Sequence, residues 1–307
     1  MKIAIMGIGG VGGYYGGMLA KGYAGDENVE VVFIARGPHL EAIKADGLRV
    51  MSAATGDFTA RPDLATDDPT DCGIFDIILL CVKGYDLIES ARLLAPNTDK
   101  NTVIISVLNG VDNAQKLKSV QGKGKIWNGC VYIGSHIVQP GVCQQTGGSC
   151  KMFFGSETNG GLDGTRIENI FRKAGIDARY TTDINHIAWE KYLFVSPLAN
   201  ATTFLNTTIG GILEDKEGME LMGNLLDELL ALARAHGIDF PEDIKELTIE
   251  KSRVFPYEAK TSLQMDFEKG KRTEIETFVE FIVREAGKLG LPVPTHKKIY
   301  AALKARE

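Results

Sequence analysis

The chain has 307 residues, 44% hydrophobic and 24% charged, a balance that is typical of globular proteins and sufficient for two medium-sized domains. Its 34 basic and 40 acidic residues give a net charge of -6, without a basic block, so we expect neither nucleic acid nor an anionic membrane as a partner. No apolar run reaches the roughly 18 residues of a membrane-spanning helix. A strand is predicted from residue 2, which leaves no room for a signal peptide, and we therefore expect a cytoplasmic protein.

The five cysteines and five histidines predict neither disulfides nor a metal site. The cysteines are odd in number and include no C-x-x-C pair, which favours reduced thiols. Cys143 and Cys150 could face each other across a hairpin, but reduced thiols remain the favoured interpretation. The histidines lack the H-x-x-x-H and H-E-x-x-H spacings of zinc sites, so we expect no metal.

The first 22 residues predict a strand, a tight glycine turn and a helix. Residues 2–6 are a short apolar run, residues 7–13 form the turn, and residues 14–20 are compatible with a helix. Gly7, Gly9 and Gly12 fill the G-x-G-x-x-G pattern, which permits close approach of the backbone to a pyrophosphate at a helix N-terminus. A purely structural glycine-rich turn is the alternative. The predicted cofactor contacts here are Gly7, Ile8, Gly9, Gly10, Val11 and Gly12.

A second strand is predicted over residues 29–35, and it would lie parallel to the first through a right-handed crossover. An NAD site commonly has Asp or Glu at the end of this strand to bind the ribose 2′-hydroxyl. The chain has Arg36 instead, which favours a 2′-phosphate and therefore NADP. An ordinary solvated arginine in a loop is the alternative.

Two further buried strands, residues 76–82 and 102–107, end at polar residues. Continuous apolar runs of this kind are typical of parallel strands covered on both faces. Lys83 and Asn109 follow them at the carboxyl edge, where open α/β sheets bind ligands, so both are candidate contacts for cofactor phosphates or a substrate carboxylate. Either could also be a polar residue that merely ends a strand. Between the second and third of these parallel strands, residues 37–45 predict a short helix, and residues 48–50 and 58–60 an antiparallel pair.

The pattern changes after Lys125. Residues 126–134, 144–146 and 152–154 predict short strands at the far edge of a mixed sheet, followed by a helix over residues 162–174 and a last strand over 177–180. From residue 184 the chain predicts helices almost throughout, over residues 184–204, 218–236, 241–253 and 274–289, with Gly237 and Gly290 as C-terminal stops. We therefore predict an α/β Rossmann-type dinucleotide-binding domain over residues 1–183 and an all-α C-terminal domain over 184–307, in which apolar helix faces leave room for a homodimer.

The helical half would supply the substrate chemistry. Lys191 lies within an otherwise aromatic and aliphatic helix, so its side chain either extends to solvent or is held in the site. Ser262 and Asp266 are spaced one helical turn apart. Glu274 opens the last long helix, where a glutamate is often only a partner of the helix dipole.

Four motifs together resemble the ketopantoate reductase family (2-dehydropantoate 2-reductase) over essentially the whole chain. They are the opening G-x-G-G-V-G-G-Y-Y-G, Leu-Asn-Gly-Val at 108–111, Trp-Glu-Lys at 189–191, and Thr-Ser-Leu-Gln-Met-Asp at 261–266 with Thr-Glu-Ile-Glu at 273–276. The resemblance implies NADPH-dependent reduction of ketopantoate to pantoate on the path to pantothenate and coenzyme A. It gives the chain a small-molecule substrate, a 2-oxo acid.

The resemblance also implies residue roles. Lys191 matches the catalytic lysine, and Glu274 matches the active-site glutamate. Asn109, Ser262 and Asp266 match substrate-side positions. Arg36 and Lys83 match contacts of the cofactor phosphates, and Asn109 and Glu274 also border the cofactor in this interpretation.

The chain departs from the family pattern on the helix of Lys191. Family members commonly carry asparagines four and eight residues after the lysine, where this chain has Val195 and Ala199, with Asn200 one place further on. Two alternatives therefore remain open: an NADP-dependent reductase of another small 2-oxo acid, and a non-catalytic dinucleotide-sensing protein. Retention of both Lys191 and Glu274 argues against the second.

Overall fold

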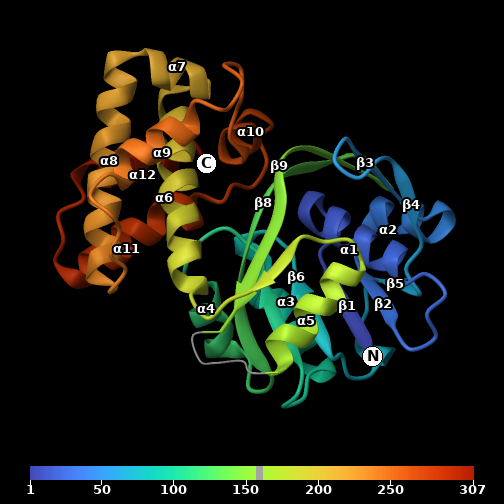
Figure 1. The fold of residues 1–307 in the computed structure, drawn as a ribbon. Helices are drawn as coiled ribbons and strands as arrows, with labels where there is room; N and C mark the ends of the chain where they lie inside the picture. The colour runs from blue at the N-terminus through green and yellow to red at the C-terminus, as the bar shows by residue number, and fades with distance from the viewer. Residues whose placement is uncertain (157–161) are drawn as a thin grey trace. The chain divides into compact units, whose positions relative to one another are not determined.

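The structure is a computed structural model that describes residues 1–156 and 162–307. The chain divides into two compact units, residues 1–188 (unit 1) and residues 189–307 (unit 2). The division falls within the long helix α6 (Ile184–Leu205) (Figure 1). In the described part of the chain, no helix is both long and apolar enough to cross a membrane.

Unit 1 is built on one mixed sheet (Figure 1). Within residues 1–156 and 162–188 the strand order is β4-β3-β9-β8-β7-β6-β1-β2-β5, and β10 pairs with β9. β1 is parallel to β2 and β6, and β7 is parallel to β6 and β8, as in a dinucleotide-binding fold. The strands are β1 (Lys2–Met6), β2 (Glu30–Ile34), β3 (Leu48–Ser52), β4 (Phe58–Ala60), β5 (Leu64–Thr66), β6 (Ile77–Leu80), β7 (Val103–Ser106), β8 (Lys125–Gln139), β9 (Val142–Gly155) and β10 (Ala178–Tyr180). The predicted Rossmann-type architecture is confirmed.

Helices cover both faces of this sheet because its central strands are apolar on both sides. In β1, Ile3 and Ile5 pack into the cluster that contains Tyr15 of α1, whereas Ala4 packs into the opposite cluster with Leu87 of α3. The same alternation runs through β2, β6 and β7. The helices of unit 1 are α1 (Gly10–Gly22), α2 (Gly37–Asp46), α3 (Leu87–Leu94), α4 (Asn113–Val120) and α5 (Leu162–Lys173), with 3₁₀ turns η1 (Thr70–Cys72), η2 (Gly84–Asp86) and η3 (Ala95–Asn97).

The region after residue 125 differs from its prediction. The expected short strands are two long ones, β8 and β9, which form a hairpin, and they lie inside the sheet because β9 also pairs with β3. Register shifts between Tyr132 and Gly134 and between Ile137 and Gln139 keep the two strands paired through glycine-rich sequence, as β-bulges do. Cys143 and Cys150 both lie on β9, and all five cysteines of the chain are free thiols.

Unit 2 is helical, as predicted. All of its residues are described, and its regular elements are the rest of α6, α7 (Ile209–Glu214), α8 (Lys216–Ala235), α9 (Ile244–Ser252), α10 (Ser262–Glu268), the π-helical turn η4 (Glu276–Glu280), α11 (Phe281–Leu289) and α12 (Pro294–Lys304). Leucines of α8 such as Leu225 and Leu229 are fully buried. Gly290 adopts the left-handed conformation that ends α11, which confirms the predicted stop.

Candidate active site

The glycine turn joins β1 to α1, and close packing explains most of its glycines. Gly7 has φ +90°, and a Cβ on it would lie 2.7 Å from Val82 Cγ1. A Cβ on Gly12 would lie 2.0 Å from the carbonyl oxygen of Gly7, and one on Gly10 would lie 2.3 Å from that of Ser135. These three glycines are therefore required by the fold itself.

Gly9 differs from the other glycines of the turn. A Cβ on Gly9 would meet no heavy atom within 4 Å, so the fold leaves open space in front of its backbone. Gly9 is the N-cap of α1, whose first turn carries no acidic side chain and presents N–H groups that lack intrahelical acceptors. This arrangement fits an anion such as a pyrophosphate, because open backbone and a positive helix end coincide. The residues present therefore fit a dinucleotide.

Two thiols border the turn and remain protonated. Burial raises the pKa of the Cys143 thiol to about 12 and the pKa of Cys81 further still. The Cys143 thiol donates a hydrogen bond to the Gly10 carbonyl at 3.2 Å. Neither sulfur therefore brings negative charge to a place that would hold a phosphate.

Arg36 follows β2 and Lys83 follows β6, the two strands that pair with β1 on either side. Arg36 caps α2 just after β2, and its side chain is 81% exposed. Its Nη2 lies 3.4 Å from Asp86 Oδ2 at the end of η2. Lys83 directly precedes that turn and follows Val82, against which Gly7 packs. The structure thus brings the glycine turn, Arg36 and Lys83 to one edge, as the sequence predicted for a parallel sheet.

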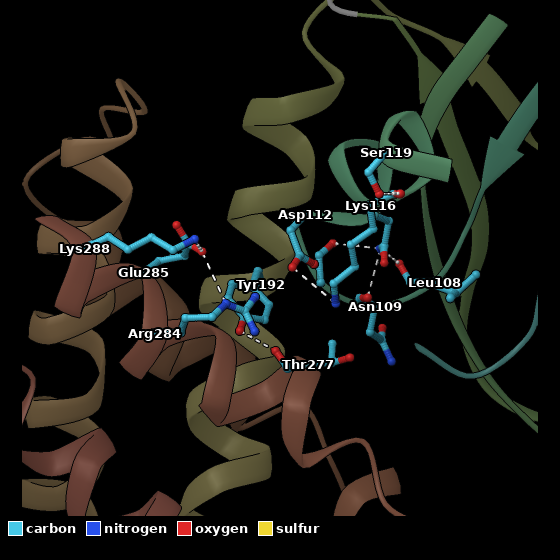
Figure 2. A network of polar contacts seen from close by, with 12 residues as sticks. Leu108, Asn109, Asp112, Lys116, Ser119, Tyr192, Thr277, Arg284, Glu285 and Lys288 are labelled. Atoms are coloured by element: carbon cyan, nitrogen blue, oxygen red, sulfur yellow. Dashed lines mark hydrogen bonds and ion pairs between the residues drawn. The ribbon is translucent and has the colours of Figure 1, made fainter. Parts of the chain in front are cut away.

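Asn109 lies in the loop between β7 and α4, and its main chain is fixed by a residue that the sequence did not single out. The Asn113 amide donates to the carbonyls of Asn109 at 3.0 Å and of Gly110 at 3.4 Å. Asp112 and Lys116 form an ion pair at 3.2 Å on the first turn of α4, with side chains only 9% and 20% exposed (Figure 2). The spacing of four residues between Asp112 and Lys116 is the sequence signal that predicts such an ion pair on a helix.

Lys191 is half-buried on α6 between two anchored aromatic residues. Trp189 packs against Tyr192, with ring centroids 6.1 Å apart. The Tyr192 hydroxyl donates to the Thr277 carbonyl at 2.6 Å (Figure 2). The lysine therefore projects from a segment whose orientation within unit 2 is fixed on both sides.

Glu274 precedes a helix that differs from its prediction. The expected continuous helix over residues 274–289 is a π-helical turn, η4, followed by α11. Glu274 is only 5% exposed, and its carbonyl accepts from the N–H groups of Thr277 at 3.0 Å and Phe278 at 3.1 Å. The predicted helix is confirmed in its extent, because residues 275–289 are helical without a break, and only the π register of its first turn differs. A sequence pattern of period near 3.6 does not distinguish a single π turn from α-helix.

Ser262 and Asp266 lie one turn apart on α10, as predicted. Ser262 is exposed and Asp266 is half-buried. The N-cap of α10, Thr261, lies 3.0 Å from Thr202 of α6, hydroxyl to hydroxyl. The helix of Ser262 is therefore tied to the helix of Lys191 within the same unit. Among the described residues, no three His, Cys, Asp or Glu side chains are grouped to hold a metal ion.

A largely parallel sheet with an open glycine turn at its carboxyl edge, followed by a helical unit, is the architecture of dinucleotide-binding proteins, to which many oxidoreductases belong. The model of the family described as "Ketopantoate reductase PanE/ApbA" matches residues 3–159, and the model of its C-terminal part matches residues 183–307. The chain belongs to the ketopantoate reductase family.

Known proteins match this chain over nearly its full length. A crystal structure of 2-dehydropantoate 2-reductase from Porphyromonas gingivalis W83 is 36% identical with a TM-score of 0.85, and the match covers 99% of each chain. A 2-dehydropantoate 2-reductase of Aquifex aeolicus is 28% identical, covering 100% of this chain and 97% of the relative. An uncharacterized oxidoreductase of Bacillus subtilis, YkpB, is also 28% identical and covers 100% and 99%.

Proposed function

We propose that this protein catalyses the NADPH-dependent reduction of ketopantoate to pantoate, a step toward pantothenate and coenzyme A. The observation that carries the proposal is that Lys191 and the buried Glu274 lie on segments joined by the Tyr192–Thr277 hydrogen bond. A family match over both units supports it, together with 2-dehydropantoate 2-reductases among the relatives.

In this proposal unit 1 holds the cofactor. The open backbone at Gly9 and the first turn of α1, from Gly10 on, receive the pyrophosphate, with Ile8 and Val11 beside them. Arg36 and Lys83 neutralise phosphate charge. Arg36 is 81% exposed and so accessible to a 2′-phosphate, which would replace Asp86 as its partner. That replacement is the basis of the proposed preference for NADPH.

In this proposal residues of unit 2, together with Asn109 of unit 1, act on the substrate. When bound, NADPH supplies a hydride to the ketone carbon. The Lys191 ammonium stabilises the negative charge that develops on the ketone oxygen and gives that oxygen its proton, so an alcohol forms. Glu274 holds the lysine or a substrate hydroxyl in line, and Ser262 and Asn109 donate hydrogen bonds to the carboxylate and hydroxyl of the acid. Asp266 is the acidic residue on the substrate side.

A second candidate, reduction of another 2-oxo acid, is favoured by the apolar face of α6. Val195 and Ala199 follow Lys191 at intervals of four residues, and they offer no hydrogen bond to a hydroxylated substrate. A branched apolar 2-oxo acid would suit such a face. The non-catalytic sensor remains as a third candidate and predicts binding without turnover.

The test is NADPH oxidation by purified protein with ketopantoate and with a panel of apolar 2-oxo acids. The highest kcat/KM for ketopantoate supports the proposal, and preference for an apolar acid replaces it by the second candidate. NADPH binding without oxidation of NADPH by any member of the panel favours the sensor.

The proposal includes the cytoplasm as location and a homodimer as assembly. Five free thiols suit a reducing compartment. A ketopantoate reductase of Staphylococcus aureus with the same fold is dimeric, at 20% identity. Light scattering at micromolar concentration measures the assembly, and a mass of 33.4 kDa would exclude the dimer.

A further inference from the structure

One face of α6 donates side-chain hydrogen bonds to the main chain of η4. Tyr192, Ser196 and Asn200 follow one another at intervals of four residues, so they share this face. The Ser196 hydroxyl donates to the Phe278 carbonyl at 2.7 Å, and the Asn200 amide donates to the same oxygen at 2.9 Å. With the Tyr192–Thr277 bond, three side chains serve two successive carbonyls.

The hydrogen-bond register of η4 explains why the Tyr192 hydroxyl lies at the Thr277 carbonyl. The N–H of Phe281 bonds to the Glu276 carbonyl, five residues back. In an α-helix the same N–H would bond to Thr277, four residues back. The π turn therefore takes that donor away from the Thr277 carbonyl, and the Tyr192 hydroxyl replaces it.

These hydrogen bonds are shielded from water. Tyr192 is 1% exposed, Ser196 and Asn200 are fully buried, and Thr277 and Phe278 are at most 4% exposed. A buried carbonyl without a donor is costly, so the Tyr192 hydroxyl favours the π register over a regular α-helix at this place. The Ser196 and Asn200 hydrogen bonds hold the next carbonyl, that of Phe278, against α6. Single π turns inside helices occur frequently at functional sites.

We propose that Tyr192, Ser196 and Asn200 are positioning residues, which hold η4 in its π register and thereby set the orientation of Glu274 relative to the segment of Lys191. The inference rests on the proposed function for its catalytic consequence. Lys191 directly precedes Tyr192, and the Glu274 carbonyl accepts from Thr277 and Phe278, the two residues that α6 holds. An altered register in η4 therefore moves the main chain of Glu274.

The variant Tyr192→Phe tests this because it deletes one hydroxyl and keeps the ring. Tyr23→Phe is a matched control in unit 1: Tyr23 is also buried, and its hydroxyl donates to the Ile170 carbonyl at 3.0 Å. Both variants should lose similar thermal stability. Only Tyr192→Phe should lower kcat, by up to about 100-fold for a displacement near 1 Å, with the KM for NADPH unchanged.

A crystal structure of Tyr192→Phe provides a readout that does not depend on activity. The expected change is that the Phe281 N–H now bonds to Thr277 and that Glu274 shifts. A retained π register with Glu274 in place would overturn the inference, and so would equal kcat values for Tyr192→Phe and Tyr23→Phe. If the register changes but the wild type reduces no 2-oxo acid, the proposed function fails while the structural part of the inference stands.

Discussion

Alanine substitution at Gly12 should lower stability, whereas alanine substitution at Gly9 should lower cofactor affinity and leave stability nearly unchanged. A Cβ on Gly12 would lie 2.0 Å from the Gly7 carbonyl oxygen and 2.9 Å from Cys81 Cβ, so α1 must move away from β1. Overpacking of this kind typically costs about 1–3 kcal/mol. A Cβ on Gly9 meets nothing within 4 Å, and the φ of -82° at Gly9 is open to alanine. Gly9→Ala should therefore change the free energy of unfolding by less than about 1 kcal/mol, in either direction.

Cofactor affinity should fall in Gly9→Ala although its stability is nearly unchanged. The methyl group of Gly9→Ala would occupy the open space in which the pyrophosphate is proposed to meet the backbone. We expect NADPH affinity to fall at least tenfold, which corresponds to about 1.4 kcal/mol of binding free energy. Gly9→Ala should thus be a stable protein that binds NADPH poorly.

Urea unfolding followed by circular dichroism gives the stabilities, and fluorescence titration with NADPH gives the affinities. The reasoning is refuted if Gly9→Ala is as unstable as Gly12→Ala, because the space before Gly9 would then not be open. Wild-type NADPH affinity in Gly9→Ala would instead show that the cofactor does not approach this turn.

Four further substitutions test individual side chains. Arg36→Ala should weaken NADPH and leave NADH affinity nearly unchanged in parallel titrations; an equal loss would mean that Arg36 does not read the 2′-phosphate. Lys191→Ala should lose about 10²–10⁴-fold in kcat while it still folds and binds NADPH, whereas near-normal turnover would remove the lysine from the mechanism. Ser262→Ala should raise the KM for the oxo acid without changing NADPH affinity, and an unchanged KM would exclude a substrate contact. Glu228→Gln tests the pH dependence of stability. Burial acts to raise the pKa of the Glu228 carboxyl, but hydrogen bonds from His296 and from the start of α12 outweigh burial and hold this pKa below its ordinary value of 4.5. The Glu228 carboxylate therefore stabilises the fold above pH 4.5, and this contribution is lost as the pH falls through the lower pKa of the folded state. The difference in unfolding free energy between wild type and Glu228→Gln should shrink in acid. A difference that does not change with pH would contradict this reasoning.

The predicted fold followed from rules that act over a few residues. Apolar runs with polar ends identified the parallel strands, and the glycine pattern identified the turn after β1. The end of that turn was predicted wrongly, because α1 begins at Gly10 and not near Tyr14. Glycine has poor helix propensity, but Gly10 and Gly13 pack against Ser135 and Cys143, and this packing outweighs propensity.

The parts of the site that the sequence did not predict depend on partners far along the chain. The donors on α6 lie about eighty residues from the carbonyls they serve: the Tyr192–Thr277 bond spans 85 positions and the Asn200–Phe278 bond spans 78. Neither hydrophobic periodicity nor local helix propensity can predict which of these distant residues pair. The π register of η4 depends on it, and so the sequence predicted an ordinary helix there.

Asn200 shows how a shift of one residue along a helix moves a side chain to another face and gives it other neighbours. By sequence, Asn200 lies one place beyond Ala199 and could have replaced the asparagine that the family carries there. Successive residues on an α-helix are rotated by about 100°, so Asn200 shares the face of Tyr192 and Ser196, and its amide is bonded to Phe278. It therefore does not restore a polar group beside Lys191 at the positions of Val195 and Ala199. Ala199 is only 2% exposed and Val195 is half-buried, so the choice between ketopantoate and an apolar 2-oxo acid depends on whether Val195 borders the substrate. A Val195→Asn variant that gains kcat/KM for ketopantoate and loses it for apolar acids would establish that Val195 does.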